Sequence, residues 1–350
     1  MRIAWVLYGD LAQRTGGTIY DAEVVAGLRR AGDDVRVLSL PRARLVRELR
    51  ATAPDVVVGD ELCFRELALA FRLLGKGAMR RVMLVHHLTA WETELAPLRR
   101  RVVRVVESLA MSASDRIVTT SHTTRRRLVA EGAKTPIAVA LPGADRLGRE
   151  RRSERGSGSE TRFLFVGSIV PRKRVIELVR AFAGGAASGD HLLLVGSTTR
   201  DEPYVGEVRA LVARLGIGDR VALAGEVEEG GVASALAEAD VLVMPSSLEG
   251  YGIAATEAIH AGVPVIAARA QGLEEALAPC PDACLFADDE RALAATMRRF
   301  ATEATLRASM SAAARRAGPL MPTWAACAAD FRAALLGEEA GVPQRDAEIG

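Results

Sequence analysis

The chain has 350 residues, which is more than one ordinary domain needs and favours two domains of about 150 residues each. Apolar residues make up 49% and charged residues 26%, a composition typical of a globular protein with sizeable cores. The formal charge of +2 gives no reason to expect a nucleic-acid partner. No apolar run is long enough to cross a membrane, and an expected strand follows the first two residues directly, so we expect a cytoplasmic protein.

Short apolar runs alternate with helical patterns along nearly the whole chain, which is typical of parallel sheets built from βαβ units. In the first half the sequence predicts strands at Ile3–Leu7, Val35–Leu38, Val56–Val58, Arg81–His86, Arg116–Thr119 and Ile137–Ala140. The helical patterns between them cover Thr18–Ala31, Leu45–Ala53, Leu62–Leu74, Pro97–Ser112 and His122–Glu131.

The segment from Arg149 to Glu160 is charged, rich in Gly and Ser and free of apolar residues, so we expect it to be a linker. Beyond it, strands are predicted at Phe163–Val166, His191–Val195, Val221–Leu223, Val241–Met244, Val263–Ala267 and Ala283–Phe286. Helices are predicted at Leu178–Ala186, Tyr204–Leu215, Val232–Ala237 and Gly252–Ala261, and the last 60 residues look helical. We therefore expect α/β domains over residues 1–155 and 156–321, a helix over 322–337 and a polar tail over 338–350.

Ligands of parallel α/β domains bind where strands end, and polar or glycine residues follow four of the predicted strands. Gly16 and Gly17 lie just before a helix, where a glycine pair allows close approach to a phosphate or simply forms a turn. His86 and His87 end another strand and are either polar contacts to a ligand or hydrogen-bonded edge histidines.

The four cysteines show no metal-binding spacing, and we expect them to be structural or incidental thiols.

A third strand is followed by Gly167 and Ser168, with Arg172 and Lys173 a few residues later. Cations beside a glycine turn suit a diphosphate whose charge grows as a bond breaks, although a solvated basic turn is the alternative.

The fourth place is the segment from Pro245 to Pro264, in which Glu249 falls in a loop and Glu257 in an early helical turn. A helix N-terminus at a strand end attracts an anion, while carboxylates accept hydrogen bonds from hydroxyls. The combination indicates a nucleotide-sugar. The spacing Gly250-x-Gly252-x-x-Ala255 mimics a dinucleotide fingerprint, but it neither follows its strand at once nor lies in the first βα unit. A nicotinamide enzyme is therefore disfavoured.

Together these motifs resemble the retaining glycosyltransferase family 4, which has the GT-B fold. The most specific match is the Glu-x7-Glu element, Glu249 to Glu257, and the supporting matches are Gly16-Gly17, His86, Ser121, Gly167 to Lys173, and Trp324. The resemblance covers nearly the whole chain. It implies two Rossmann-like domains whose parallel sheets face each other across a cleft, with the C-terminal helix returning to the N-terminal domain.

The resemblance also implies roles for individual residues. Glu249 would accept hydrogen bonds from the transferred sugar, Glu257 would hold the nucleotide ribose, and His86 would lie near the reaction centre. Lys173 and Gly17 would hold the diphosphate, together with the backbone around Gly252 and Ile253. The rest of the expected donor site is Gly16, Gly167, Ser168, Arg172, Gly250 and Tyr251.

Two features concern the leaving diphosphate. The family commonly has Arg where this chain has Ser168, and Arg172 is the available substitute. No Asp-x-Asp pair occurs, so cationic side chains and helix dipoles are expected in place of a metal, and no cofactor is expected beyond the nucleotide-sugar co-substrate. The implied mechanism is transfer with retention, in which the departing diphosphate deprotonates the incoming hydroxyl.

Acceptor choice is expected in the N-terminal domain, around Asp10–Tyr20, Glu61–Arg65 and His87–Glu94, with a glycan, cell-envelope precursor or small metabolite as acceptor. The basic segment Arg99–Val106 either makes a weak peripheral contact with anionic lipid or is a helix with arginines outward and valines in the core, and the second interpretation is favoured.

Two other functions stay open. One is a catalytically impaired nucleotide-sugar-binding protein, which Ser168 suggests, and the other is a nucleotide-sugar epimerase, which the Glu-x7-Glu element disfavours. Nothing in the sequence indicates an oligomeric state.

Overall fold

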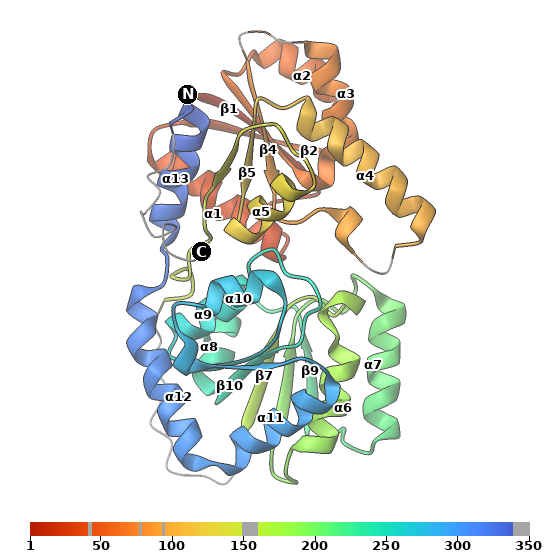
Figure 1. The fold of residues 1–350 in the computed structure, drawn as a ribbon, viewed down its shortest axis with the longest axis vertical. Helices are drawn as coiled ribbons and strands as arrows, with labels where there is room; N and C mark the ends of the chain where they lie inside the picture. The colour runs from red at the N-terminus through yellow and green to blue at the C-terminus, as the bar shows by residue number, and fades with distance from the viewer. Residues whose placement is uncertain (41–43, 76, 78, 93–94, 149–159, 339–350) are drawn as a thin grey trace.

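The protein is described by a computed structural model that covers residues 1–40, 44–75, 77, 79–92, 95–148 and 160–338. Two six-stranded sheets, each flanked by helices, lie one above the other along the long axis (Figure 1). All strand pairs within the sheets are parallel. This is the doubly wound α/β architecture that the alternating pattern predicts.

The first sheet has the strand order β2-β1-β3-β4-β5-β6. Its strands are β1 (Arg2–Tyr8), β2 (Asp34–Leu40), β3 (Val56–Asp60), β4 (Arg80–Val85), β5 (Arg116–Thr119) and β6 (Ile137–Val139). The helices that accompany them are α1 (Gly16–Arg30), α2 (Leu45–Thr52), α3 (Phe64–Leu74), α4 (Pro97–Ser112) and α5 (His122–Ala130), with short 3-10 turns η1 (Glu61–Cys63) and η2 (Thr89–Trp91). The chain reverses its direction of winding between β1 and β3, and such a switch point opens a crevice at the carboxyl ends of the strands.

The second sheet has the order β12-β11-β10-β7-β8-β9. Its strands are β7 (Arg162–Val166), β8 (His191–Val195), β9 (Val221–Gly225), β10 (Val241–Met244), β11 (Val265–Ala268) and β12 (Cys284–Ala287). They alternate with α6 (Val175–Gly185), α7 (Glu202–Arg214), α8 (Glu229–Glu238), α9 (Ile253–His260), α10 (Gln271–Leu277), α11 (Glu290–Thr302) and α12 (Ala304–Ala317), and with η3 (Pro171–Lys173), η4 (Pro281–Ala283) and η5 (Gly318–Leu320). Here the switch point lies between β7 and β10, so the loops after these two strands are neighbours.

The last helix, α13 (Trp324–Leu336), leaves the second sheet and packs on the first, as predicted. Its Phe331 ring lies 5.3 Å from Trp5 of β1. Two glycines permit this close packing: a Cβ at Gly27 would lie 2.3 Å from Ala328, and one at Gly143 would lie 2.2 Å from the Trp324 nitrogen. At the same end Asp33 is buried between the N-terminal ammonium and Arg332, each 2.8 Å away.

Each predicted strand and each named helix is found, with shifts of a few residues at the ends. The sequence did not single out α10, which has only seven residues and no long apolar period. Helix α9 begins at Ile253 because Gly252 before it has φ of 104°, a left-handed conformation that favours glycine. The proposed linker (apart from Glu160), the boundary at 155/156 and the tail beyond Glu338 lie outside the described residues. Among the described residues, no helix is long and apolar enough to cross a membrane.

Candidate active site

A cleft of about 930 Å³ lies between the two sheets, at the carboxyl ends of their strands. The loops that follow β1, β3 and β4 line it from one side, and those that follow β7, β8 and β10 line it from the other. The structure brings into this single cleft every residue that the sequence assigned to the site: Gly16, Gly17, His86, Gly167, Ser168, Arg172, Lys173, Glu249, Gly250, Tyr251, Gly252, Ile253 and Glu257.

The two loops at the second switch point are joined by an ion pair. Lys173, in η3 after β7, donates from Nζ to the carboxylate of Glu249 in the loop after β10. The backbone supports the same junction, since Ser247 N–H donates to the Arg172 carbonyl at 2.9 Å. Burial disfavours the charge on Glu249, but the nearby Lys173 and Arg172 outweigh it and lower the pKa of this carboxyl. Burial lowers the pKa of Lys173 although Glu249 opposes the shift.

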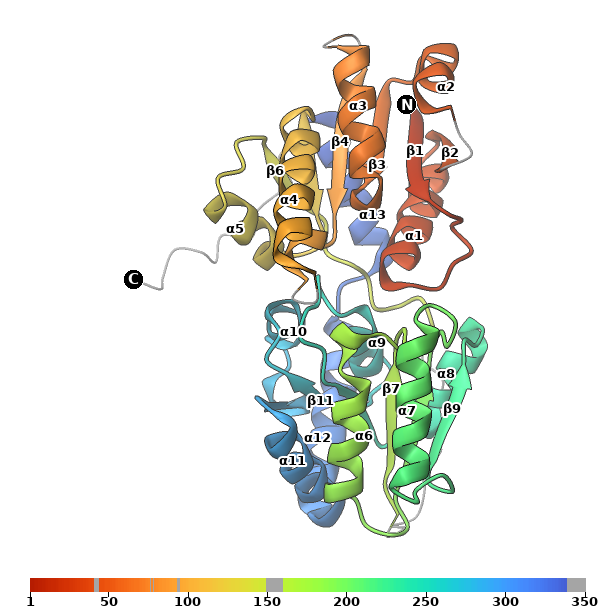
Figure 2. The same cartoon turned by 90° about the vertical axis from the view of Figure 1, so that its right-hand side faces the viewer.

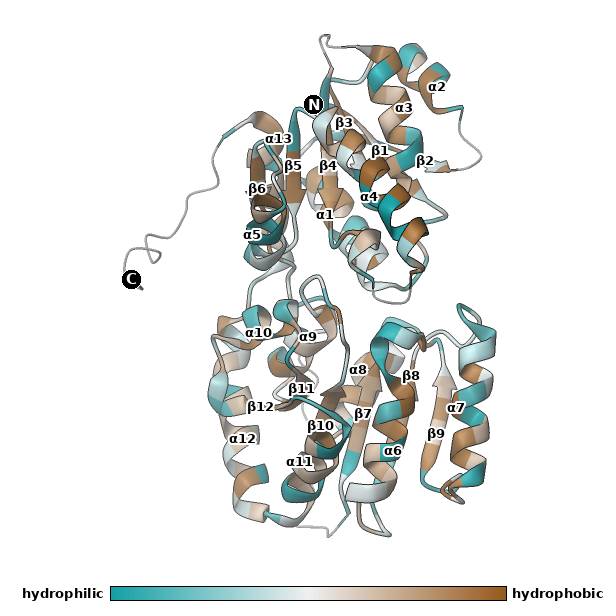
Figure 3. Ribbon diagram, turned by 45° about the vertical axis from the view of Figure 1, so that its right-hand side comes forward, coloured by the Kyte–Doolittle hydropathy of each residue, from teal (hydrophilic) through white to brown (hydrophobic). Residues whose placement is uncertain are grey.

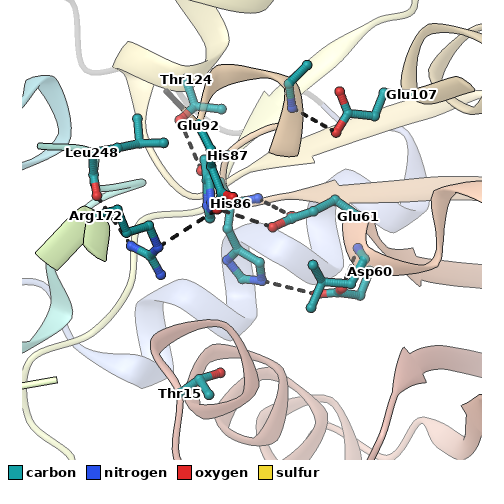
Figure 4. A network of polar contacts seen from close by, with 12 residues as sticks. Thr15, Asp60, Glu61, His86, His87, Glu92, Glu107, Thr124, Arg172 and Leu248 are labelled. Atoms are coloured by element: carbon teal, nitrogen blue, oxygen red, sulfur yellow. Dashed lines mark hydrogen bonds and ion pairs between the residues drawn. The ribbon is translucent and has the colours of Figure 1, made fainter. Parts of the chain in front are cut away.

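On the opposite wall, His86 lies immediately after β4 and points its ring toward buried carboxylates (Figure 4). Nε2 is 3.5 Å from Asp60, the last residue of β3, and 3.8 Å from Asp21 of α1. Glu61 accepts a hydrogen bond from the His86 backbone N–H. A Cβ at Gly17 would lie 3.5 Å from the His86 ring, so the first turn of α1 passes close to this imidazole.

These carboxylates decide the charge of His86. Burial alone would lower the pKa of the imidazole, but Glu61, Asp21 and Asp60 together raise it well above its ordinary value. Burial, and then the Asp60 charge, raise the pKa of Asp21 to about 6, while His86 opposes the shift. The carboxylates around His86 therefore favour the protonated form of its imidazole. Its Nε2 faces the carboxylates, which leaves Nδ1 as the ring nitrogen for other partners.

The ligand atoms of Asp21, Asp60 and His86 lie within 4.8 Å of one another, so by distance alone these side chains could hold a cation. The same carboxylates raise the pKa of His86, so a metal at this position would compete with the proton of the imidazole.

Glu257, on the first turns of α9, is buried and paired with Arg146, a residue of the segment between the two sheets. Arg146 donates to Glu257 at 2.8 Å from Nη2 and 3.0 Å from Nε, and its Nη1 lies 2.8 Å from Glu229 of α8. Burial raises the pKa of Glu257 to about 7, although Arg146 opposes the shift. Arg146 and Glu257 both line the cleft.

The two halves touch beside the cleft. A Cβ at Gly250 would lie 2.5 Å from the His86 carbonyl oxygen, so only glycine allows these two loops to meet. Nearby, Glu275 of α10 accepts from the backbone N–H groups of His122 and Thr123 at 2.7 and 2.6 Å. A carboxylate at the N-terminus of α5 satisfies donors that the helix leaves free.

Comparison with known proteins identifies the chain. Two family models match it: Glycosyltransferase Family 4 over residues 11–146 and Glycosyl transferases group 1 over residues 148–317. The chain belongs to glycosyltransferase family 4. A search of curated proteins finds no match.

Solved structures share the GT-B fold with this family 4 glycosyltransferase. Sucrose-phosphate synthase from Thermosynechococcus elongatus has a TM-score of 0.82 at 20% identity, over 96% of this chain and 98% of its own. Anabaena HepE in complex with UDP and glucose has a TM-score of 0.79 at 17% identity, over 96% and 99%. WaaG, a glycosyltransferase involved in lipopolysaccharide biosynthesis, has a TM-score of 0.75 at 19% identity, over 96% and 100%.

Several cleft residues of this glycosyltransferase were not singled out by the sequence. Asp60 ends an apolar strand, so the strand-end rule that found His86 could have found it as well. Glu61 was expected near the acceptor, and although it lines the cleft it is buried against His86. Asp21 and Arg146 carry no comparable signal, because a helix-interior aspartate and a lone arginine among 46 basic residues look ordinary in sequence.

The structure also refines three expected contacts. Tyr251 is only 6% exposed, so its side chain offers little surface to a donor. Ser121 accepts from the Thr124 N–H at 3.0 Å and thus caps α5. Ser168 is half-buried and lines the cleft between Gly167 and the cations of η3.

Proposed function

We propose that this glycosyltransferase moves a sugar from a nucleotide diphosphate sugar to a hydroxyl acceptor, with retention at the anomeric carbon and without a metal. In this proposal Glu249 binds the sugar hydroxyls and Glu257 the ribose. Lys173, Arg172 and the α9 N-terminus bind the diphosphate. His86 faces them from the other half of the cleft, next to the sugar.

The observation that carries the proposal is the meeting of Lys173 and Glu249 at the switch point between β7 and β10. A donor has to bring its diphosphate next to its sugar, and here a cation and a hydroxyl-binding carboxylate lie side by side. The α9 N-terminus opens into the same cleft and adds free N–H groups and a positive dipole end. The similarity to HepE, which was solved with UDP-glucose, supports a nucleotide-sugar donor.

Retention is proposed through reaction on one face of the sugar, without a covalent intermediate. Glu249 is paired with Lys173 and Glu257 with Arg146, which disfavours either carboxylate as a covalent nucleophile. Asp21 and Asp60 are buried and face His86. We infer that the departing diphosphate takes the proton of the incoming hydroxyl on the same face. The imidazolium of His86 and the ammonium of Lys173 stabilise the charge that develops.

Metal independence is proposed because the cations of the cleft are built into the protein. Activity in the presence of a strong chelator should equal activity with added Mg²⁺ or Mn²⁺. Activity that is lost on chelation and restored by a metal would overturn this part of the proposal.

A thermal-shift panel of UDP, GDP, ADP and TDP sugars tests the donor class, because a ligand that binds only the native state raises the melting temperature. We expect the sugars of one nucleotide to raise the melting temperature. In a separate incubation, we expect the same nucleotide-sugar to be slowly hydrolysed to free nucleotide. Binding without any turnover would instead support the impaired nucleotide-sugar-binding protein that Ser168 suggests. Anomeric analysis of the transferred sugar then tests retention, and an inverted product would refute the proposed mechanism.

A further inference from the structure

The exposed apolar side chains of this protein are concentrated on one pair of helices. Among the residues that the structure describes, twelve large hydrophobic residues are exposed, and six of them lie on α3 and α4: Leu69, Leu73, Leu98, Val102, Val105 and Leu109. Scattered exposed apolar residues are ordinary, but a concentration on one surface marks a site of interaction.

On α4 the exposed apolar residues form a single stripe. Leu98 is 78% exposed, Val102 and Val105 are each 55% exposed, and Leu109 is 53% exposed. Their spacing of four, three and four residues places all four on one side of the helix. The opposite side faces the core through Val103 and Ala110. The expectation that the valines of this helix point into the core is therefore wrong for Val102 and Val105.

Arginines border the stripe on both sides. At 100° per residue, Arg101 and Arg104 fall on one flank of the stripe and Arg99 on the other, and all three are exposed. No ion pair joins them to a residue in the described part of the chain. The one acidic residue of α4, Glu107, is buried and accepts a hydrogen bond from the Ala90 N–H. The exposed face of α4 is thus apolar in the middle and cationic at its edges.

Helix α3 extends this surface. It packs beside α4 on the same face of the first sheet (Figure 2). Its exposed side carries Leu69 and Leu73 together with Arg65 and Arg72. Apolar and polar bands alternate along α4 in the hydropathy view as well (Figure 3).

We propose that α4, supported by α3, docks this glycosyltransferase on an anionic lipid surface. The four side chains of the α4 stripe enter the headgroup boundary, and Arg99, Arg101 and Arg104 contact lipid phosphates, which is how interfacial amphipathic helices bind. A second copy of the chain fits less well, because a two-fold contact would set this cationic face against itself without acidic partners. Helix α4 begins at Pro97, ten residues after His87, so docking would bring the acceptor side of the cleft toward the membrane.

The test is sedimentation of the full-length protein with phosphatidylcholine vesicles that contain or lack phosphatidylglycerol. We expect binding to the anionic vesicles that weakens as salt is raised, and little binding to the neutral ones. The double variant Arg101→Gln/Arg104→Gln should reduce binding about tenfold or more. Arg209→Gln/Arg214→Gln removes the same charge from the exposed face of α7 and should leave binding unchanged.

The apolar stripe is tested separately with Val102→Ser/Val105→Ser, and Leu320→Ser, at an 81% exposed site, is its control. We expect the pair of serines to reduce vesicle binding while the circular dichroism spectrum and nucleotide binding stay unchanged. Equal binding by the wild-type protein and both α4 variants would overturn the proposal. So would a wild-type dimer in lipid-free solution that the serine pair converts to monomer, because the stripe would then be a subunit interface. Since vesicle binding requires no sugar transfer, its failure is distinguishable from failure of the proposed reaction.

Discussion

The guanidinium of Arg146 contacts Glu257 through two nitrogens, with Nη2 2.8 Å and Nε 3.0 Å from the same carboxylate oxygen. Both side chains are more than nine-tenths buried. The residue expected to bind ribose is thus held by an arginine that comes from the segment joining the two sheets. A donor that uses Glu257 has to share this carboxylate with Arg146, so we expect Arg146 to position Glu257 for the ribose.

Arg146→Ala should destabilise the protein by about 3 kcal/mol, because it leaves the Glu257 carboxyl buried without a charge partner. The double variant Arg146→Ala/Glu257→Gln should be more stable than the single variant, since no unpaired charge remains. Urea unfolding of the wild type, both single variants and the double variant measures this cycle. Additive losses would show that the two residues do not interact as described.

Replacing Lys173 should weaken nucleotide binding. Lys173→Met removes a cation expected at the diphosphate, and we expect affinity for a nucleoside diphosphate to fall about tenfold to a hundredfold. Calorimetric titration of the nucleotide gives the affinity. Lys134→Met is the matched control, because Lys134 is exposed and outside the cleft. If both variants bind the nucleotide like the wild type, the diphosphate is not bound at η3.

Glu249→Gln should separate binding from turnover. The amide keeps the shape of the side chain but weakens acceptance of hydrogen bonds from sugar hydroxyls, so kcat should fall about a hundredfold. Affinity for the nucleotide without its sugar should stay the same or rise, because Lys173 loses its partner. A variant with wild-type kcat would remove Glu249 from the reaction.

The charge of His86 should be visible as a function of pH. Because the folded-state pKa is raised, the stability gained from this imidazolium is fully present below the ordinary value of about 6.5 and is lost as pH rises through the higher folded pKa. Asp60→Asn removes one supporting carboxylate and should move this loss to lower pH. Nitrogen NMR of the imidazoles gives the protonation state, with the exposed His191 in the same spectra as a reference. A neutral His86 near pH 7 in the wild type would contradict the description of the site.

Ser168→Arg should raise kcat if the missing arginine limits departure of the diphosphate, by about tenfold. Ser197→Arg makes the same change in the neighbouring loop after β8, outside the cleft lining, and should have no effect. Unchanged turnover in Ser168→Arg would indicate that Arg172 already does this work. Arg172 is well placed for it, because it lies close enough to Glu249 and His87 to lower the pKa of each.

The strands and most helices could be predicted because each buried strand is a short apolar run between polar turns. The cleft could be predicted because ligands of parallel α/β domains bind at the carboxyl ends of the strands. The partners of the cleft residues could not be predicted from the sequence. Asp21 meets His86 only through the packing of α1 on the first sheet, and Arg146 meets Glu257 across 111 residues. The outward valines of α4 show a second limit. Its apolar positions fit two faces of the helix, and only the packed structure tells which one is covered.

The position of α13 bears on how the protein forms during synthesis. Trp324, Phe331 and Leu335 complete the core that Trp5 and Tyr20 begin, although more than 300 residues separate the two ends of this cluster. The first half of the chain leaves the ribosome long before these residues do. It therefore exposes an apolar surface on α1 and β1 until α13 arrives, and the faster synthesis reaches α13, the shorter the time in which this surface can aggregate.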